Sequence, residues 1–371
     1  MIHVERLLKE FCELVAIDSV SFHERKMADT LKNKLFELDV EVNEDNAGER
    51  YKGNAGNIFG FLKGTIPGPP ILFSAHMDTV EPGVGKKAIL QEDGRIVSEG
   101  TVLGADDVSG IVAILEALRV LKENSIPHRD IEVLFPIAEE VYIKGTNVFD
   151  FTKVKAKEGY VLDLSGDVGL AALQAPAIIT FEIQVRGKAS HAGFDPESGI
   201  NAIAIAAEAI TGVLQGRIDD DTTVNIGCIS GGTATNIVSE KVCIKGEIRS
   251  YCQNKASQHI DRIRDRFQQI ALKYNAKVVF NFNIDATAYC VEDTESVVKR
   301  FLTVCKELGY ESKLTKTFGG SDNNNFLKHG IKGIVLACGM NQVHSTGEYS
   351  DVEELVKSTK IVIGLMTSKE V

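Results

Sequence analysis

Apolar residues in the first part of the chain alternate between helical and strand spacing. Spacings of three and four predict helices, and short apolar runs bounded by turn residues predict strands. We expect helices at residues 4–16, 24–38 and 108–121, and strands at 58–62, 71–75, 131–137 and 160–164. Helices that alternate with fully apolar strands are typical of an α/β fold, with a mixed, mostly parallel sheet covered by helices on both faces.

The spacing changes at residue 177. Apolar and polar residues alternate from 177 to 187, which indicates a strand with one face in solvent. Further elements are expected in the order helix, strand, strand, helix, strand, at residues 200–214, 223–229, 242–251, 260–270 and 277–284. This β-α-β-β-α-β order predicts a ferredoxin-like unit.

The α/β spacing resumes after this unit, with a helix at 294–308, a strand at 331–337 and a closing helix at 351–367. We therefore predict one domain built from residues 1–176 and 287–371, interrupted by an inserted domain of residues 177–286.

Composition narrows the classes of partner. The 371 residues include 41 Lys and Arg against 52 Asp and Glu, a net charge of −11, which argues against nucleic acid and anionic membrane surfaces. No apolar run reaches the roughly 18 residues of a membrane span, and the charged N-terminus does not resemble a signal peptide. Seven cysteines without a C-x-x-C spacing indicate reduced thiols and a cytoplasmic protein.

Two polar segments directly follow predicted strands. His76 and Asp78 share one face of an extended segment, so Asp78 can orient a metal-binding imidazole. Glu139 and Glu140 point to opposite sides, so one can bind a metal while the other faces water. Taken alone, the first segment is better explained as a solvated pair and the second as a solvated acidic turn.

Three further residues occupy similar positions. Asp106 lies just before the helix at 108–121, where it could simply cap the helix. Asp163 ends a strand, where a turn role is the alternative, and His344 lies in a loop that precedes the last helix.

Taken together, these residues offer mixed nitrogen and oxygen ligands. Such ligands suit zinc, cobalt or manganese, and the carboxyl ends of parallel strands converge on one crevice. The five candidate ligands can hold two ions if one carboxylate bridges them; they are His76, Asp106, Glu140, Asp163 and His344.

The same segments resemble the dinuclear-zinc exopeptidase and amidohydrolase family, in its peptidase T-like branch. The resemblance rests on Ser74–Gly83, Leu103–Gly110, Glu139–Glu140, Gly187–Gly193 and Phe318–Asp322, which occur in family order. The chain departs from that branch at Tyr142, where relatives usually carry glycine.

The resemblance implies a role for each residue. His76 and Asp163 would hold one zinc ion, Glu140 and His344 would hold the other, and the Asp106 carboxylate would bridge the two ions. The peptide bond between Asp106 and Asp107 would be cis. Asp78 would orient His76, and Glu139 would be the general base. In the inserted domain, a lid that can also form a homodimer, His191 would stabilise the oxyanion, while Asn236 and Arg249 would bind substrate.

The implied activity is hydrolysis of small peptides by an aminopeptidase similar to tripeptidases. The alternatives are a deacylase of N-acyl amino acids, a carboxypeptidase on the same scaffold, or a non-catalytic metal-binding protein. No G-x-S-x-G, P-loop or dinucleotide motif is present to favour another chemistry.

Overall fold

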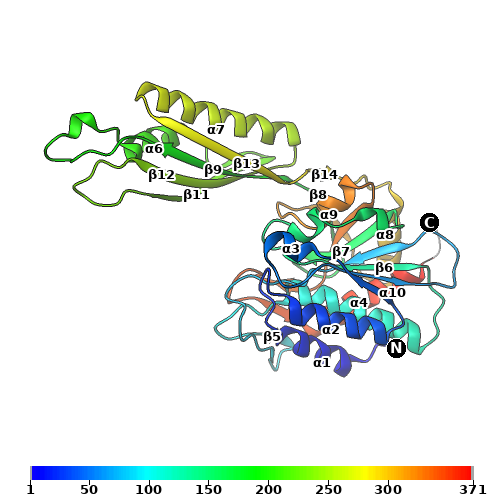
Figure 1. Cartoon of the computed structure of the whole chain (residues 1–371). Helices are drawn as coiled ribbons and strands as arrows, with labels where there is room; N and C mark the ends of the chain where they lie inside the picture. The colour runs from blue at the N-terminus through cyan, green and yellow to red at the C-terminus, as the bar shows by residue number, and fades with distance from the viewer. Residues whose placement is uncertain (1, 369–371) are drawn as a thin grey trace. The chain divides into compact units, whose positions relative to one another are not determined.

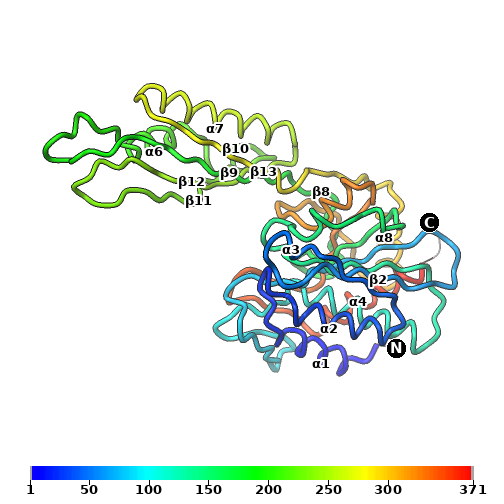
Figure 2. The backbone as a smooth tube through the Cα atoms, in the orientation of Figure 1, coloured from blue at the N-terminus to red at the C-terminus, as the bar shows by residue number. Residues whose placement is uncertain are grey.

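The computed structural model describes residues 2–368, and the chain divides into two compact units. The larger unit is built from Met1–Gln174 and Cys290–Val371, and the smaller unit is Ala175–Tyr289. The chain enters the smaller unit at the end of β8 (Leu170–Ala175) and leaves it at β14 (Tyr289–Cys290), so the smaller unit is a single insertion (Figure 2). The catalytic and lid roles of these two units stay predictions.

The larger unit is organised around a nine-stranded sheet. Its central strands β6 (Ile131–Phe135), β3 (Ile71–Ser74), β7 (Glu158–Leu164) and β16 (Lys332–Ala337) are neighbours in that order, and each pair is parallel. Antiparallel strands β1 (Glu41–Glu44) and β2 (Ile58–Leu62) extend one edge, and β8, β14 and β15 (Lys313–Lys316) extend the other. The mixed, mostly parallel sheet expected from the sequence is confirmed.

Helices cover both faces of this sheet (Figure 1). On one face α4 (Ala105–Glu123) packs against β3 and β7, and α1 (Val4–Val15) and α10 (Val352–Thr367) pack on α4. The opposite face carries α9 (Asn323–Lys328), whose Phe326 joins a core cluster with Leu72 and Val161. The remaining helices are α2 (Arg25–Glu37), α3 (Ala47–Tyr51), α5 (Lys144–Asn147) and α8 (Ser296–Leu308).

Burial on both faces explains the fully apolar strands. Leu72 packs in the cluster with Phe326, while the next residue, Phe73, stacks on Tyr160 at a centroid distance of 5.6 Å. The Tyr160 hydroxyl donates to the carbonyl of Val297 in α8. If apolar and polar residues alternated along these strands, the polar side chains would be buried beneath one of the two helix layers, at a cost in free energy.

The smaller unit is a five-stranded antiparallel sheet with two helices. Its strand order is β10 (Gly216–Asp219), β11 (Thr222–Gly231), β12 (Lys241–Ser250), β9 (Ala177–Arg186) and β13 (Lys277–Ala286). Alternate residues of β9 form a core with α6 (Ala202–Thr211) and α7 (Gln253–Lys273). The predicted β-α-β-β-α-β order is confirmed, with the short edge strand β10 added.

A second, four-stranded sheet in the larger unit is absent from the sequence-based prediction. It consists of β17 (Met340–Asn341), β18 (Tyr349–Asp351), β5 (Arg95–Val97) and β4 (Ile89–Leu90), which are too short to show a periodic pattern. The sheet matters because it fixes the segment around His344 beside the segment that leads to Asp106.

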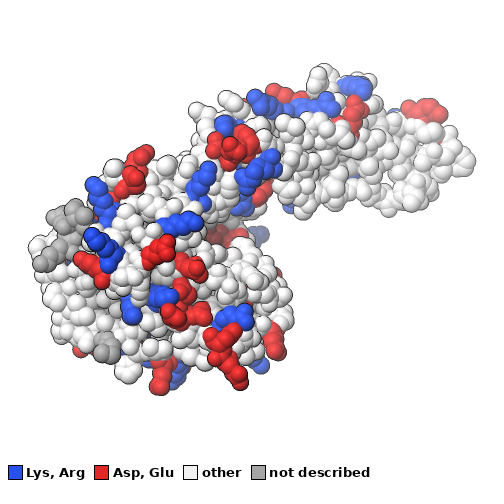
Figure 3. Space-filling view, turned by 180° about the vertical axis from the view of Figure 1, so that it is seen from behind, with Lys and Arg blue, Asp and Glu red and all other residues white. Residues whose placement is uncertain are grey.

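The surface carries both signs of charge. Figure 3 shows acidic and basic side chains interspersed over one face of the larger unit, while those of the smaller unit gather along one margin of the same view. Among residues 2–368, no helix combines the length and apolar character needed to cross a bilayer.

Candidate metal centre

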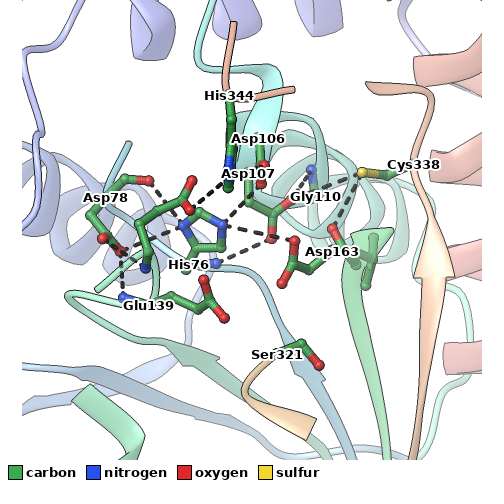
Figure 4. A network of polar contacts seen from close by, with 12 residues as sticks. His76, Asp78, Asp106, Asp107, Gly110, Glu139, Asp163, Ser321, Cys338 and His344 are labelled. Carbon is green, nitrogen blue, oxygen red and sulfur yellow. Dashed lines mark hydrogen bonds and ion pairs between the residues drawn. The ribbon is translucent and has the colours of Figure 1, made fainter. Parts of the chain in front are cut away.

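The candidate ligands meet at the carboxyl ends of the central parallel strands. His76 follows β3, Glu139 and Glu140 follow β6, and Asp163 lies near the end of β7. Asp106 begins α4, and His344 lies between β17 and β18. The structure therefore brings all five predicted ligands, together with Asp78 and Glu139, into one cluster of the larger unit (Figure 4).

His76 is buried at the centre of this cluster and is held in one orientation. Its Nδ1 lies 2.9 Å from the backbone carbonyl of Asp78 and 3.5 Å from the Asp78 carboxylate. A carbonyl can only accept, so Nδ1 carries the hydrogen and Nε2 faces Asp106 Oδ1 at 3.0 Å. Nε2 is the nitrogen free to bind a cation, and Asp78 orients the ring mainly through its main chain.

The Asp78 carboxylate holds the two glutamates instead. Its Oδ1 accepts the backbone N–H of Glu139 at 2.9 Å, and its Oδ2 accepts that of Glu140 at 3.2 Å. The Ser21 hydroxyl donates to Oδ2 at 2.6 Å. Asp78 thus joins the segment that carries His76 to the segment that carries the predicted base.

Asp106 lies between the two imidazoles. One carboxylate oxygen faces His76 Nε2 at 3.0 Å, and the other faces His344 Nε2 at 3.3 Å. His344 Nε2 also lies 2.8 Å from Glu140 Oε2. This arrangement suits a bridging carboxylate with one imidazole on each side.

Asp163 lies beside His76 in this cluster. Its Oδ1 lies 3.9 Å from His76 Nε2, and ligand atoms of His76, Asp107 and Asp163 all lie within 4.8 Å of one another. Ligand atoms of His76, Asp106 and Glu140 form a second such group. The cluster therefore offers two overlapping sets of donor atoms.

Crowding of buried acids shifts their protonation strongly. Burial, together with the charge of Asp163, raises the pKa of Glu139 well above its usual range. Burial raises the pKa of Glu140 to about 7, and the nearby charge of Asp106 adds to this rise. Hydrogen bonds with Asp106 and Glu140 raise the pKa of His344 to about 10. The raised pKa values of Glu139 and Glu140 mean that added positive charge beside them would favour their ionised forms.

Divalent cations fit this donor set. Glu140 Oε1 is buried and has no hydrogen-bond partner within the described residues, and an orphaned carboxylate oxygen is costly unless a cation or donor reaches it. His76 Nε2 and Asp106 Oδ1, at 3.0 Å, are close enough to share one ion at the usual ligand distances of about 2.0–2.2 Å. The cluster is thus a candidate site for divalent metal ions.

A pocket of about 190 Å³ opens onto these residues. Asp106, Glu139 and His344 line one part of it, and Thr317 and Gly319–Ser321 line another. Ser321 lies beneath Glu139 and Asp163 in the view of Figure 4. The pocket gives a small substrate access to both the donor atoms and the predicted base.

The backbone at Tyr142 adopts a conformation that favours glycine. Its φ is 73° and that of Ile143 is 58°, so two consecutive side chains adopt the left-handed conformation. Glycine adopts this region without steric cost. The turn is closed by the Ile143 N–H, which donates to the Glu139 carbonyl at 2.7 Å, so the strain lies directly beside the predicted base and ligand.

The three predicted substrate residues belong to the smaller unit. His191 and Asn236 lie on adjacent loops, because His191 pairs with Ile237 and the Ala192 N–H donates to the Asn236 carbonyl at 3.0 Å. Arg249 lies on β12, where Glu247 accepts from its guanidinium at 2.8 and 3.2 Å. His191 and Asn236 are therefore neighbours, and Arg249 is already paired with a carboxylate.

Several supporting residues were not predicted from the sequence. Asp107 accepts the backbone N–H of His76 at 3.2 Å and that of Gly110 at 3.2 Å, and the Cys338 thiol donates to the Leu162 carbonyl at 3.3 Å (Figure 4). Ser21 and Glu348 also bond to the ligand segments. Asp107 adjoins a predicted ligand and Glu348 follows His344 by four residues, but nothing in the local sequence separates them from solvated acids.

Two family models match the chain. The model of the M20 peptidase dimerisation domain matches residues 175–275, which lie in the smaller unit up to its last strand. The model of peptidase family M28 matches residues 57–171, which include four of the five predicted ligands.

Several proteins are similar to this chain over nearly its whole length. The uncharacterised protein YqjE of Bacillus subtilis is 38% identical over 367 residues, covering 99% of each chain. The crystal structure of aminopeptidase PepT from Bacillus cereus is 38% identical with a TM-score of 0.89, covering 99% of this chain and 98% of that one. A tripeptidase from Staphylococcus aureus is 34% identical with a TM-score of 0.94 and the same coverage.

Proposed function

The chain belongs to the peptidase T-like branch of the M20 metallopeptidases, and we propose that it removes N-terminal residues from small peptides, with two zinc ions and Glu139 as general base. Metal-dependent hydrolysis of peptide bonds follows from the family. The proposal adds the identity of the ions, the direction of cleavage and the roles of individual residues. The observation that carries it is the Asp106 carboxylate between His76 Nε2 and His344 Nε2.

The proposed ligands divide into two sets. His76 and Asp163 would hold one ion, Glu140 and His344 would hold the other, and Asp106 would serve as a ligand shared by both. Two bound ions would lower the pKa of a water molecule from about 15.7 towards 7 and polarise the scissile carbonyl. The mixed imidazole and carboxylate donors suit zinc, with cobalt or manganese as substitutes.

We propose that Glu139 moves the proton. Its backbone is fixed by Asp78, its side chain faces the pocket, and it is 8% exposed. We assign it the removal of a proton from the attacking water and the delivery of that proton to the departing amine nitrogen. Burial raises the pKa of the Glu139 carboxyl above its usual range in the metal-free protein.

His191 is the proposed oxyanion donor of the smaller unit. Its Nδ1 accepts the backbone N–H groups of Gly193 and Phe194, each at 3.1 Å. The hydrogen of a neutral ring therefore lies on Nε2, which is free to donate to a developing negative charge. Asn236, on the adjoining loop, is the proposed partner of His191 in binding substrate.

Arg249 is the proposed anchor for a substrate carboxylate, since guanidinium and carboxylate groups pair in a bidentate manner. Its bonds to Glu247 mean that a substrate must share or displace that carboxylate. The R249A variant should raise KM for peptides with a free C-terminus and leave amidated peptides unaffected. Equal KM values for both substrate sets in R249A and the parent would remove Arg249 from this role.

We also propose that the protein acts in the cytoplasm as a homodimer formed by the smaller unit. Residues 175–275 match a dimerisation domain. In the described chain, β10 pairs with β11 only at Thr222–Val224, and the exposed Ile229 lies on the part of β11 beyond it. An open strand edge is a surface for pairing with another chain. Light scattering should show that the parent protein is a dimer and that I229K dissociates to monomers more readily.

The decisive test combines metal analysis with a peptide panel. Chelation should abolish hydrolysis of di- and tripeptides with free N-termini, and zinc or cobalt should restore it, with two ions bound per chain. Acetylated peptides and N-acyl amino acids should be poor substrates. Preference for the acylated compounds would favour the deacylase alternative, and release of C-terminal residues would favour a carboxypeptidase.

A further inference from the structure

Helix α4 starts without a capping side chain of its own. Gly104 occupies the N-cap position with φ 75°, and no side chain at that position bonds to the helix. Asp106 and Asp107, which follow, have backbone angles outside the helical range. The first N–H groups of a helix have no acceptor within the helix, so those at the start of α4 need acceptors from another part of the chain.

Glu348 provides these acceptors. Its Oε2 accepts the Gly104 N–H at 2.8 Å, and its Oε1 accepts the Asp106 N–H at 3.0 Å. The Glu348 residue is only 2% exposed, and a carboxylate at a helix N-terminus is favoured both by charge-assisted hydrogen bonds and by the helix dipole. Because both oxygens are used, the backbone on either side of Ala105 is fixed in position and in direction.

The segment that carries Glu348 also carries His344. The Glu348 N–H donates to the Ser345 carbonyl at 3.1 Å, which closes a turn between the two side chains. Strand β18 then pairs with β5 and anchors the end of this turn. One short segment therefore contacts Asp106 twice, at its carboxylate through His344 and at its backbone through Glu348.

We propose that Glu348 is a positioning residue of the metal centre: its carboxylate holds the Asp106 main chain so that both oxygens of the Asp106 side chain face the two imidazoles. This inference rests on the proposed function only in taking Asp106 as a metal ligand. Glu348 is not among the residues that line the pocket, so we assign it a role that acts through Asp106.

The E348Q variant tests this role. An amide keeps the size of the side chain but replaces one acceptor with an NH₂ group that faces a backbone N–H. The matched control is E354Q, because Glu354 also accepts a backbone N–H, that of Val168 at 2.6 Å, without contacting a candidate ligand. Competition with a chromophoric zinc chelator gives the metal affinity, and hydrogen exchange of the metal-free protein reports on the Asp106 amide.

In E348Q we expect zinc affinity to fall by about 10- to 100-fold, the usual effect of losing a group that holds a ligand in place. The Asp106 amide should exchange faster, and kcat should fall more than KM changes. E348D, which keeps the carboxylate on a shorter side chain, should recover part of the affinity even if E348Q folds poorly. E354Q should match the parent in zinc affinity.

Parental zinc affinity and Asp106 exchange in E348Q would overturn the proposal, as would an equal loss of affinity in E354Q. The D106N variant separates this failure from failure of the proposed function. If D106N loses zinc while E348Q keeps it, only the role of Glu348 is wrong. If D106N keeps both ions, the proposed ligand assignment is wrong.

Discussion

The Asp78 carboxylate accepts the backbone N–H of Glu139 at 2.9 Å, so a residue two positions after one candidate ligand fixes the predicted base on a neighbouring strand end. The same carboxylate accepts from Glu140. Asp78 therefore links the segment of the candidate metal ligand His76 to the segment of the predicted base, Glu139.

The first prediction concerns this link. D78N should lower kcat by about 10- to 100-fold, because its amide group faces the N–H of Glu139 or Glu140 where an acceptor is required. S21A, which removes only one of the bonds to Asp78, should have a much smaller effect. Steady-state kinetics with metal in excess measure both variants. Similar losses in the two variants would argue for a general structural effect instead.

The adjacent glutamates should separate catalysis from metal binding. E139Q should keep two ions and lose at least about 100-fold in kcat, since a positioned general base contributes 10²–10⁴-fold. E140Q should lose metal, because its carboxylate carries the orphaned Oε1 and faces His344. Metal analysis of the purified variants, beside their turnover, makes the comparison. Parental activity in E139Q would exclude Glu139 as the base.

Glu24 should make the metal-free protein less stable as pH rises. Burial, reinforced by the charge of Asp78, raises the pKa of Glu24 to about 7 from 4.5, so between these values the folded state binds more protons than the unfolded state. The free energy of unfolding must then fall as pH rises through this window. Glu24 Oε1 accepts the Ala138 N–H at 3.1 Å, and its other oxygen is buried without a hydrogen-bond partner among the described residues.

The E24Q variant removes this titration. It should gain stability over the parent from pH 4.5 to 7, by at most about 3 kcal/mol, and match the parent more closely at pH 4. Urea unfolding of both metal-free proteins at several pH values measures the difference. A gain that is the same at pH 4 and pH 8 would exclude ionisation of Glu24 as its cause.

Tyr142 should be a site where substitution increases stability. A left-handed conformation costs an ordinary residue about 1–2 kcal/mol, and glycine returns about 0.5–1 kcal/mol of this through chain entropy. Y142G should therefore be more stable by about 0.5–1 kcal/mol, and Y142N by less. Thermal unfolding ranks the variants. Destabilisation of Y142G would show that contacts of the 38% exposed ring outweigh the backbone strain.

Phe194 should affect catalysis through His191. The two rings stack at a centroid distance of 4.2 Å, and Phe194 is 88% exposed. F194A keeps the backbone N–H that bonds to Nδ1 but frees the ring to turn, so kcat should fall while metal content stays constant. F194Y should behave like the parent. Nitrogen NMR of labelled His191 should show the hydrogen on Nε2, and a hydrogen on Nδ1 would contradict the donor role.

The sequence predicted the central sheet because burial on both faces leaves continuous apolar runs, such as Ile71–Phe73 and Val133–Phe135. It missed elements with no such signal. Strand β8 is rich in alanine, β17 and β4 have two residues each, and α9 begins with three asparagines. These elements form because neighbouring strands and helices provide their contacts, which local spacing does not encode.

The residues of the candidate site likewise include some that the sequence predicted and some that it did not. Residues at strand ends, such as His76 and Asp163, were found because parallel strands share a carboxyl edge. Glu348 and Ser21 were missed because each acts on a segment distant in sequence, Glu348 on Asp106 and Ser21 on Asp78. The Asp78 contact also differs from the expected one, since the backbone carbonyl is the closer partner of His76.

The two imidazoles differ in their access to solvent: the His76 side chain is 1% exposed, and that of His344 is 53% exposed. Water and competing chelators can therefore reach His344, while His76 stays shielded from solvent. We expect the two ions to leave at different rates, with the ion beside His344 lost first. Enzyme prepared under metal limitation should then accumulate as a half-loaded form, in which the supply of one replaceable ion sets the level of activity.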